Sequence, residues 1–301
     1  MITCRNSEPL NYGEVTDTIV DVLSRYLLES GIKTMVIGLS GGLDSTVSSA
    51  LCCLVSKKTG IPLIGVSLPC STNQADEVNG AMLAGKEFCN KFIENNIQDV
   101  FTVIERSCEG ISESKSTPIS QGNIKARLRM IILYDIASKM GGIVIDNDML
   151  TENALGFWTI NGDCFDISPL SNLWKHEVYE LAKYLRDNVF NDSKALESAI
   201  NITPTDGNGV SSSDMEQIMP GFTYNDVDKI LMSWVGLDER IKESYIEEDF
   251  ENVRGTVFEP LIKEYGKDNV KKVIMRNVRS AFKRYPHPIP IDIFNKCIVK
   301  K

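Results

Sequence analysis

Residues 34–45 read Thr-Met-Val-Ile-Gly-Leu-Ser-Gly-Gly-Leu-Asp-Ser, and this stretch decides the fold. Its apolar run, residues 34–40, is too short for a helix and rich in branched side chains, which favours a buried parallel strand. Residues 62–69 and 142–146 have the same character, and residues 99–105 are a fourth candidate strand. Helical patterns separate these runs. The alternation predicts an α/β fold in which helices flank a doubly wound parallel sheet.

Apolar positions at helical spacing mark the helices between and after these strands. The stripes occupy residues 15–26, 124–136, 178–185, 227–234 and 270–282. The last two predict a helical C-terminal part. Two polar stretches, residues 109–122 and 203–214, break the regularity. We expect them to be loops, either ligand-binding segments or ordinary surface connections.

The composition limits the function classes. At roughly 150 residues per domain, 301 residues make one large domain or two small ones. The chain has no apolar run of about 18 residues and no leader pattern at its N-terminus, so we expect a cytoplasmic protein without a membrane segment. Its eight cysteines form no CxxC pair, and the sequence therefore encodes neither a zinc cage nor a disulfide framework. The net charge of −9 disfavours nucleic-acid binding, although a local basic pocket remains possible.

The segment after the first strand has the features of a phosphate-binding loop. Gly41 and Gly42 let the backbone turn sharply and approach a ligand, and the helix start that follows supplies free N–H groups. Ser40 and Ser45 add hydroxyl groups. The loop lacks a Lys after its glycines, so it is not a Walker A sequence, and it does not match the GxGxxG dinucleotide pattern. Such a nest suits a pyrophosphate group.

Asp44 is unusual in a phosphate-binding loop. A carboxylate beside phosphate oxygens is repulsive unless a cation lies between them, so Asp44 favours a bridging Mg²⁺ ion. The alternative is an ordinary acidic residue in the first turn of a helix, where it interacts with the helix dipole.

The Ser-Gly-Gly-Leu-Asp-Ser sequence at residues 40–45 resembles the pyrophosphatase loop of the N-type ATP pyrophosphatases. The resemblance implies a Rossmann-like sheet of the adenine nucleotide alpha hydrolase type. It also implies that ATP is cleaved between its α and β phosphates, with an adenylated intermediate and released pyrophosphate. The loop alone does not separate NAD synthetase, GMP synthetase, asparagine synthetase, argininosuccinate synthetase and tRNA-thiolating enzymes.

Further segments resemble NAD synthetase in their order and spacing. They are Gln121–Met130, Thr151–Asp163, Asp166–Lys175, Pro204–Gly207, Gly221–Asp228 and Phe282–Pro286. The resemblance covers residues 12–287 and implies a single synthetase domain over residues 1–301, with its core sheet at about 12–190 and a C-terminal loop and helices at about 200–290. Because these motifs fill the chain, we expect no glutaminase domain. Family resemblance also implies a homodimer.

The resemblance assigns binding roles residue by residue. ATP contacts are expected from Gly38, Leu39, Ser40, Gly41, Gly42, Leu43, Asp44, Ser45, Asn147, Lys175 and Thr205. Deamido-NAD contacts are expected from Arg127, Asp166, Phe282 and Lys283. Lys125, Arg127 and Arg129 are expected near the start of a helix, where cations and free amides could meet an anion. The alternatives are solvated surface cations and, for Phe282, a core residue.

Four residues are expected to carry the metal and the catalysis. Asp44 and Glu152 are candidate oxygen ligands for Mg²⁺. Lys175 opens a helix, where its charge opposes the dipole, so an anion should compensate it. Asp163 follows a glycine in a short turn, where a carboxylate could hold ammonia or take its proton. The alternatives are an exposed helix carboxylate for Glu152 and a turn-forming Asp163.

Three departures from the NAD synthetase pattern affect the expected contacts. Asp146 and Asn147 stand where the family usually has Gly-Thr, so an amide replaces a hydroxyl that contacts ATP. Ile160 stands where a Lys is common, which removes a cation near the substrate. One residue is also missing between Asp163 and Asp166. These departures leave adenylation in place but change the expected substrate contacts.

The sequence therefore predicts ATP-dependent amidation of deamido-NAD to NAD, with Mg²⁺ and free ammonia and with release of AMP and pyrophosphate. One alternative is another adenylating enzyme of this loop class, for example one that modifies tRNA. The net negative charge, which disfavours tRNA binding, and the lack of paired cysteines for sulfur transfer argue against this alternative. Another is a nucleotide-binding protein that has lost catalysis, which the departures at Asp146, Asn147 and Ile160 motivate.

Overall fold

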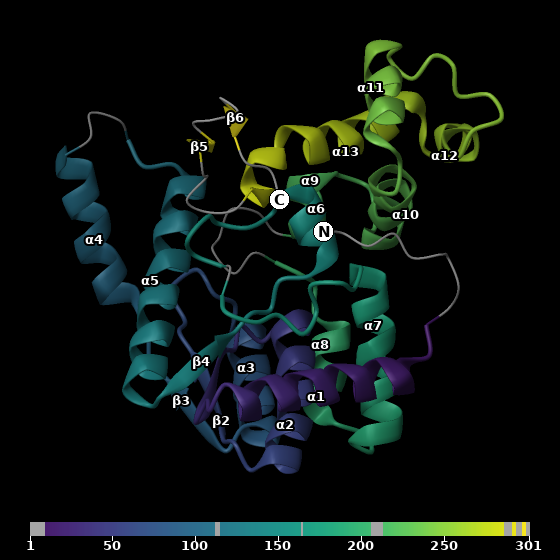
Figure 1. Cartoon of the computed structure of the whole chain (residues 1–301). Helices are drawn as coiled ribbons and strands as arrows, with labels where there is room; N and C mark the ends of the chain where they lie inside the picture. The colour runs from purple at the N-terminus through teal and green to yellow at the C-terminus, as the bar shows by residue number, and fades with distance from the viewer. Residues whose placement is uncertain are drawn as a thin grey trace. The chain divides into compact units, whose positions relative to one another are not determined.

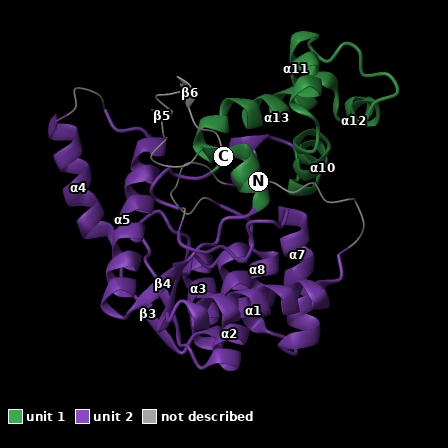
Figure 2. Ribbon diagram, viewed as in Figure 1, with its two compact units in different colours: residues 1–8, 150–157, 222–301 green, residues 9–149, 158–221 purple. Residues whose placement is uncertain are grey.

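The structure is a computed structural model that describes residues 10–111, 115–163, 165–205, 213–285, 291–292 and 297–298. The chain forms two compact units (Figure 2). Unit 2 contains residues 9–149 and 158–221, and unit 1 contains residues 1–8, 150–157 and 222–301.

Unit 2 is built on a four-stranded parallel sheet (Figure 1). Its strands are β1 (Thr34–Gly38), β2 (Leu63–Ser67), β3 (Lys91–Glu94) and β4 (Gly142–Ile145), in the order β3-β2-β1-β4. The central strand β1 pairs with β2 through Val36 and Ile64 and with β4 through Ile37 and Ile145. The predicted strands at 34–40, 62–69 and 142–146 are confirmed, as is the doubly wound parallel sheet.

Helices connect the strands and continue after the sheet. The helices of unit 2 are α1 (Tyr12–Glu29), α2 (Leu43–Thr59), α3 (Ala75–Phe88), α4 (Gln98–Ile111), α5 (Pro118–Lys139), α7 (Lys175–Tyr184), the π-helical turn η1 (Leu185–Val189), α8 (Lys194–Asn201) and α9 (Asp214–Ile218). Helix α5 packs on β1 and β4, whereas α2 and α3 pack on β1, β2 and β3. No helix in the described part of the chain is long and apolar enough to cross a membrane.

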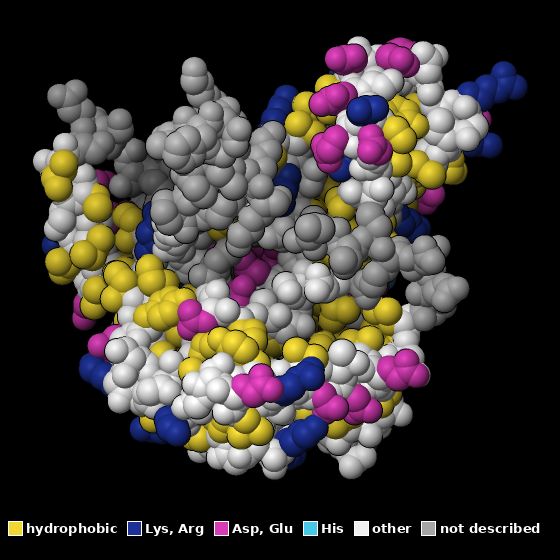
Figure 3. All heavy atoms as spheres, in the orientation of Figure 1, with side chains coloured by type: hydrophobic (Ala, Val, Ile, Leu, Met, Phe, Trp, Pro, Cys, Tyr) yellow, Lys and Arg dark blue, Asp and Glu magenta, His cyan; other side chains and the backbone are white. Residues whose placement is uncertain are grey.

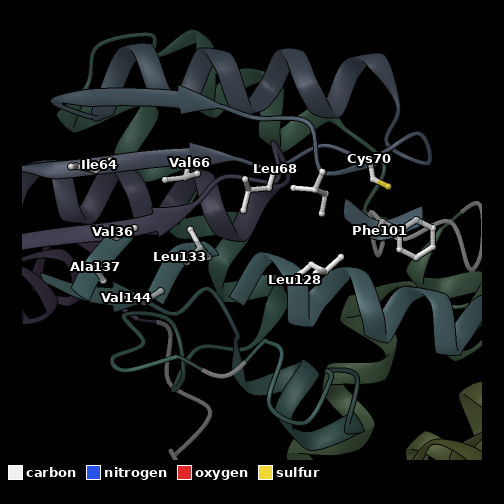
Figure 4. Close-up of a cluster of buried hydrophobic side chains, with 11 residues drawn as sticks. Val36, Ile64, Val66, Leu68, Cys70, Phe101, Leu128, Leu133, Ala137 and Val144 are labelled. Carbon is white, nitrogen blue, oxygen red and sulfur yellow. The ribbon is translucent and has the colours of Figure 1, made fainter. Parts of the chain in front are cut away.

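A buried apolar cluster joins the sheet to α4 and α5 (Figure 4). Val36, Ile64 and Val144 lie side by side on neighbouring strands and point toward α5. Leu133 and Phe101 close the cluster from α5 and α4. Burying a side chain of this size stabilises a fold by about 1.5–3 kcal/mol. Because the apolar runs of the strands are buried on both faces, they show no alternation in the sequence.

The prediction of a strand at residues 99–105 is wrong, because these residues lie inside α4. The Asn96 side chain accepts a hydrogen bond from the backbone N–H of Gln98 (2.8 Å) and starts the helix there. Phe101 is buried against α5, whereas Val100 and Val103 are 49% and 63% exposed. Figure 3 shows hydrophobic side chains at the surface where Figure 1 places α4. The fourth strand is β3, at residues 91–94, which pairs with β2 at the edge of the sheet.

The expected loop at residues 109–122 is also mostly wrong. Helix α4 continues to Ile111 and α5 begins at Pro118, a residue suited to the first helical turn. The side chains of Thr117 and Ser120 accept hydrogen bonds from each other's backbone N–H groups and form a capping box. Residues 112–114 of the expected loop, and most of the loop at 203–214, lie outside the described residues.

Unit 1 is mainly helical. Its elements are α6 (Leu150–Leu155), α10 (Tyr224–Val235), α11 (Glu239–Glu247), α12 (Phe258–Tyr265), α13 (Lys267–Arg279), the 3-10 turn η2 (Ala281–Arg284) and the antiparallel pair β5 (Ile291–Asp292) and β6 (Cys297–Ile298). The predicted helical stripes at residues 227–234 and 270–282 lie in α10 and in α13 with η2. Trp234 of α10 packs against Phe250 and Phe258. The predicted cap at Thr223 is confirmed, since Thr223 and Asp226 form a capping box.

Candidate active site

The predicted phosphate-binding loop connects β1 to α2. Gly41 has a φ of +84°, and Gly42 is the N-cap of α2. The hydroxyls of Ser40 and Ser45 lie 3.1 Å apart, and the Ser40 hydroxyl accepts a hydrogen bond from the backbone N–H of Gly42 (3.2 Å). Leu39 and Leu43 are buried and anchor the loop on either side. The loop thus places the first turn of a 17-residue helix at the carboxyl end of the central strand.

Helix α3 packs directly on this loop. A Cβ atom at Gly41 would lie 1.9 Å from the carbonyl oxygen of Glu77, and one at Gly80 would lie 2.7 Å from the carbonyl oxygen of Gly41. The two segments therefore meet backbone to backbone, and only glycines fit at positions 41 and 80. Sequence reasoning identified Gly41 but not its partner, because the partner lies on another helix.

Lys175 and Asp44 form a buried ion pair beside the loop. The Lys175 Nζ lies 2.5 Å from the Asp44 Oδ2, and the two side chains are 2% and 18% exposed. Lys175 is the first residue of α7, and the anion expected to compensate its charge is Asp44 from α2. The Asp44 Oδ1 is buried and has no hydrogen-bond partner among the described residues. One oxygen of this carboxylate therefore holds the lysine, and the other can receive a cation or a donor.

Two residues missed by the sequence analysis lie near this pair. Burial raises the pKa of Tyr179, while the charge of Lys175 lowers it and the charges of Asp44 and Asp214 raise it. Asp214 is 4% exposed and opens α9. A buried carboxylate and a partly buried phenol thus share the surroundings of Lys175. No spacing in the sequence indicates this arrangement, because the residues come from three separate helices.

The end of β4 lies beside the start of the loop. The Asn147 Nδ2 donates a hydrogen bond to the carbonyl oxygen of Gly38 (2.9 Å). Its Oδ1 is buried and has no hydrogen-bond partner within the described part of the chain. Asn147 therefore fixes the first residue of the loop with one end of its amide and keeps an acceptor at the other end. Its predicted contact with ATP stays a prediction.

Thr205, another predicted ATP contact, lies at the N-terminal end of α3. Its hydroxyl donates a hydrogen bond to the Oε1 of Glu77. The Oε2 of Glu77 accepts from the Asn73 side chain (2.9 Å) and from the backbone N–H of Gln74 (3.0 Å). Glu77 thus ties the segment before residue 206 to the helix that supports the loop, a role that the sequence analysis missed.

Asp163 closes a turn that follows α6. Its Oδ2 accepts a hydrogen bond from the backbone N–H of Thr159 (2.6 Å), and the Thr159 hydroxyl bonds to the Asn123 side chain (2.9 Å). Gly162 packs against Ala126 of α5, where a Cβ atom would come within 3.2 Å. Asp163 therefore stabilises the turn, as the alternative in the sequence analysis predicted. Its role toward ammonia stays a prediction.

The predicted cationic start of α5 is wrong. The helix begins at Pro118, so Lys125, Arg127 and Arg129 lie in its middle, away from the free amides of its first turn. Lys125 is buried, and its Nζ donates to the Thr72 hydroxyl (3.1 Å). Arg127 is exposed and donates to the backbone carbonyl of Ile160 (3.2 Å). Of these three cations Arg127 is the exposed one, and its contact with a substrate anion stays a prediction.

Asp166 is held between β4 and α5. Its Oδ1 accepts from the Tyr134 hydroxyl (2.9 Å), and its Oδ2 accepts from the backbone N–H of Val144 (2.9 Å). The segment around Asp166 continues the sheet, since Ile167 bridges Ile145 in parallel. A direct contact between Asp166 and substrate stays a prediction.

Asp146, at the carboxyl end of β4, is a buried carboxylate in unusual surroundings. It is 8% exposed, and its Oδ1 accepts from the backbone N–H of Asp148 (3.1 Å). Burial raises the pKa of Asp146 from 3.8 to about 6; the Asp163 carboxylate raises it as well, and the amides of Asp148, Asn147 and Phe165 lower it. The family's usual glycine at this position carries no such group.

Asp146→Asn should raise the free energy of unfolding at pH 7 by about 2–3 kcal/mol. A carboxylate whose pKa is raised on folding favours the folded state only while protonated, so the wild type loses stability as the pH rises from about 4 to about 6. The neutral amide side chain of the variant removes this loss of stability. Urea unfolding of both proteins at several pH values measures the difference in the free energy of unfolding, with the exposed Asp135→Asn as control. A stability difference that stays constant over this pH range would contradict the prediction.

Glu152, Phe282 and Lys283 belong to unit 1. Glu152 lies in α6, which two buried hydrogen bonds hold against its neighbours: Thr151 to Asp228 (2.5 Å) and the Asn277 side chain to the carbonyl of Ala154 (2.7 Å). The Lys283 Nζ donates to the carbonyl oxygen of Gly156 (2.7 Å), and Phe282 is about half exposed rather than in the core. Their predicted contacts with metal and substrate stay predictions.

The parallel sheet, the glycine loop at its central strand and the buried Lys–Asp pair are features of the α/β nucleotide-binding proteins. A family model described as NAD synthase matches residues 15–286. The chain belongs to the NAD synthase family and is a ligase that forms carbon–nitrogen bonds.

Individual relatives agree with this assignment. The chain is 30% identical to an NH(3)-dependent NAD(+) synthetase of Wolinella succinogenes, over 93% of this chain and 96% of that one. Among solved structures it is similar to an NMN synthetase from Francisella tularensis, with 26% identity, a TM-score of 0.71, and coverage of 94% of this chain and 99% of that one. An NH3-dependent NAD synthetase from Campylobacter jejuni has a TM-score of 0.60 at 23% identity, covering 90% and 96%, and confirms the fold.

Proposed function

We propose that this chain converts deamido-NAD to NAD with ATP and ammonia, releasing AMP and pyrophosphate. The observation that carries the proposal is the Lys175–Asp44 pair at the glycine loop, within a chain of the NAD synthase family. Lys175 would neutralise charge on the phosphates of ATP while Asp44 orients the lysine. Arg127, Asp166, Phe282 and Lys283 would contact deamido-NAD.

The chemistry explains why ATP is needed. A free carboxylate resists attack by ammonia because its leaving group would be oxide. Transfer of AMP to the nicotinate carboxylate supplies a viable leaving group, which ammonia then displaces. In the first step a carboxylate oxygen bonds to the α-phosphorus of ATP and forms a mixed anhydride, while the Pα–O bond breaks and pyrophosphate leaves with its electron pair. The second forms the C–N bond, and AMP departs with the electrons of the C–O bond.

The donor set fits Mg²⁺ as a substrate-bound ion. Mg²⁺ is usually held by one or two carboxylates together with substrate phosphates and water. The unpartnered Oδ1 of Asp44 suits this role, with Glu152 as the proposed second ligand. The described residues contain no cluster of three or more His, Cys, Asp or Glu that could hold a metal without substrate. When bound, the ion would neutralise charge on the phosphates.

The proposal is tested with purified protein, deamido-NAD, ATP and Mg²⁺, with either ammonium or glutamine as nitrogen donor. We expect NAD and AMP in equal amounts with ammonium and little product with glutamine. ADP as the nucleotide product, or no NAD at all, would reject the proposal. Omitting Mg²⁺ should stop both products, and tight tRNA binding at moderate salt would instead favour a tRNA-modifying enzyme.

A second candidate substrate is the corresponding mononucleotide, nicotinate mononucleotide. The similarity to an NMN synthetase over 94% and 99% of the two chains favours it. The absence of a lysine at Ile160 also fits a substrate with fewer phosphates. A competition assay with equal concentrations of both acids decides between them: the acid with the higher kcat/KM is the substrate, and Ile160→Lys should shift the ratio toward deamido-NAD.

We also propose that residues 1–301 act as one synthetase domain and that two copies associate. The family match over residues 15–286 supports the single domain, and family resemblance supports the homodimer. Sedimentation equilibrium should give a mass near twice 33.5 kDa. A monomer that is fully active at the same concentration would contradict the dimer.

A further inference from the structure

Glu77 contacts both the phosphate-binding loop and a predicted ATP contact. It lies in the first turn of α3 and is 7% exposed. Its backbone carbonyl packs against the loop, where a Cβ atom at Gly41 would lie 1.9 Å from the carbonyl oxygen. Its side chain contacts Thr205, whose hydroxyl donates a hydrogen bond to the Glu77 Oε1. Glu77 therefore joins Thr205 to the glycine loop, although 128 residues separate Glu77 from Thr205.

The second oxygen of Glu77 fixes the orientation of the carboxylate. The Oε2 accepts from the Asn73 side chain (2.9 Å) and from the backbone N–H of Gln74 (3.0 Å), the N-cap of α3. The Asn73 Oδ1 in turn accepts from the backbone N–H of Cys70 (2.9 Å) and from the guanidinium of Arg129 (3.3 Å). None of these bonds involves residue 205. The Oε1 of Glu77 is therefore an acceptor whose position is set by α3 and α5.

The backbone beside Thr205 is fixed as well. The backbone N–H of Asp214 donates to the carbonyl oxygen of Pro204 (3.0 Å), so the residue before Thr205 is tied to the start of α9. Asp214 belongs to the surroundings of Lys175, since both act electrostatically on the Tyr179 phenol. Thr205 is thus held by the segment near the buried ion pair and, through its side chain, by the helix that packs on the glycine loop.

The bond to Glu77 determines what the Thr205 hydroxyl can offer to a ligand. A hydroxyl group has one proton and two lone pairs. The proton of Thr205 is donated to a carboxylate, which accepts hydrogen bonds and has no proton to give in return. Toward a nucleotide the Thr205 oxygen can therefore offer a lone pair but no proton. A phosphate oxygen requires a hydrogen-bond donor, whereas a phosphate-bound Mg²⁺ ion requires oxygen lone pairs.

We propose that Glu77 is a positioning residue of the ATP site, which turns the Thr205 hydroxyl so that its oxygen faces the magnesium-bound form of ATP. The proposal rests on the proposed function. Glu77 does not touch the nucleotide and acts only through Thr205. Part of the preference for magnesium-bound over free ATP then comes from the direction of one O–H bond. Without the carboxylate, the hydroxyl can turn its proton to a phosphate oxygen, and this part of the preference is lost.

Glu77→Gln tests the proposal because it reverses this bond in a side chain of the same size. The glutamine carbonyl can still accept from Asn73 and Gln74, and its amide then donates to the Thr205 oxygen. Calorimetric titration with ATP, in Mg²⁺ and in EDTA, measures the effect. We expect the affinity in Mg²⁺ to fall about 10–100-fold, the usual effect of removing a group that orients a metal ligand. The affinity in EDTA should change at most about threefold, since no metal ligand is involved.

Thr205→Val removes the group through which Glu77 would act. We expect it to lower the affinity in Mg²⁺ by a similar factor, and Glu77→Gln to have no further effect in its presence. Additive losses in the double variant would overturn the proposal, because Glu77 would then act by another route. Equal losses in Mg²⁺ and in EDTA, or a wild type without a preference for Mg²⁺, would overturn it too and leave Glu77 as a cap of α3 only.

Asp226→Asn is the matched control. Asp226 occupies the same position in α10 as Glu77 in α3, and it accepts from the hydroxyl (2.6 Å) and the backbone N–H (2.9 Å) of Thr223. It should cost stability and leave both ATP titrations as in the wild type. Glu77→Asp, which keeps the charge but is one methylene shorter, should give the same metal-dependent loss if Glu77→Gln folds poorly. A wild type that binds no ATP in either titration would instead reject the proposed function.

Discussion

Replacing Lys175 with Met should lower kcat for amide formation by about 10³-fold, because removing one preorganised donor to a developing charge costs about 3–4 kcal/mol. It should also destabilise the fold by about 3–5 kcal/mol, since the Asp44 carboxylate would remain buried without its partner. The Lys175 Nζ lies 2.5 Å from the Asp44 Oδ2, and the lysine side chain is 2% exposed. Steady-state kinetics and urea unfolding measure the two effects.

The double variant Asp44→Asn with Lys175→Met separates stability from catalysis. A buried ion pair replaced by neutral groups of similar size is often nearly neutral for stability, so the double variant should regain most of the stability lost by Lys175→Met. Its activity should stay at or below the level of the single variant, because the lysine charge is still missing and the proposed Mg²⁺ ligand at position 44 is lost as well. If activity returned together with stability, the pair would be a structural contact only.

Local signals made the core of this fold predictable. The strands β1, β2 and β4 are buried on both faces, so their residues are apolar in unbroken runs that the sequence displays directly. The edge strand β3 is half exposed and contains Lys91 and Glu94, so its sequence lacks the unbroken apolar run that identifies the buried strands. The branched residues 99–105 imitate a strand because α4 carries the exposed apolar residues Val100 and Val103 beside the buried Phe101, which gives a nearly continuous apolar run.

The site was predictable only where one segment contains the signal. The glycine loop and Asp44 are contiguous with β1 and could be assigned from residues 38–45. The pairing of Asp44 with Lys175 joins positions 131 residues apart, and the sequence indicated only that Lys175 needs an anion. The raised pKa of Asp146 arises from burial and from Asp163, which depend on the folded sheet. The sequence analysis therefore identified Asp146 only as a departure from the NAD synthetase pattern.

Gly41→Ala should destabilise unit 2 by about 3–5 kcal/mol and abolish nucleotide binding at millimolar ATP, because two separate costs add at this position. The backbone of Gly41 has a φ of +84°, which strains any residue with a Cβ atom. The new Cβ would also lie 1.9 Å from the carbonyl oxygen of Glu77, an atom in the first turn of α3 that cannot move without shifting the helix.

Gly60→Ala is the matched control for this prediction. Gly60 caps the other end of the same helix α2 with a φ of +75°, but a Cβ atom there would meet nothing within 4 Å. It should cost only the backbone strain, about 1 kcal/mol, and leave ATP binding unchanged. Urea unfolding and calorimetric titration of ATP compare the two variants. Equal losses of stability would show that φ alone decides the effect, and normal ATP binding by Gly41→Ala would mean that the phosphates lie elsewhere than on this loop.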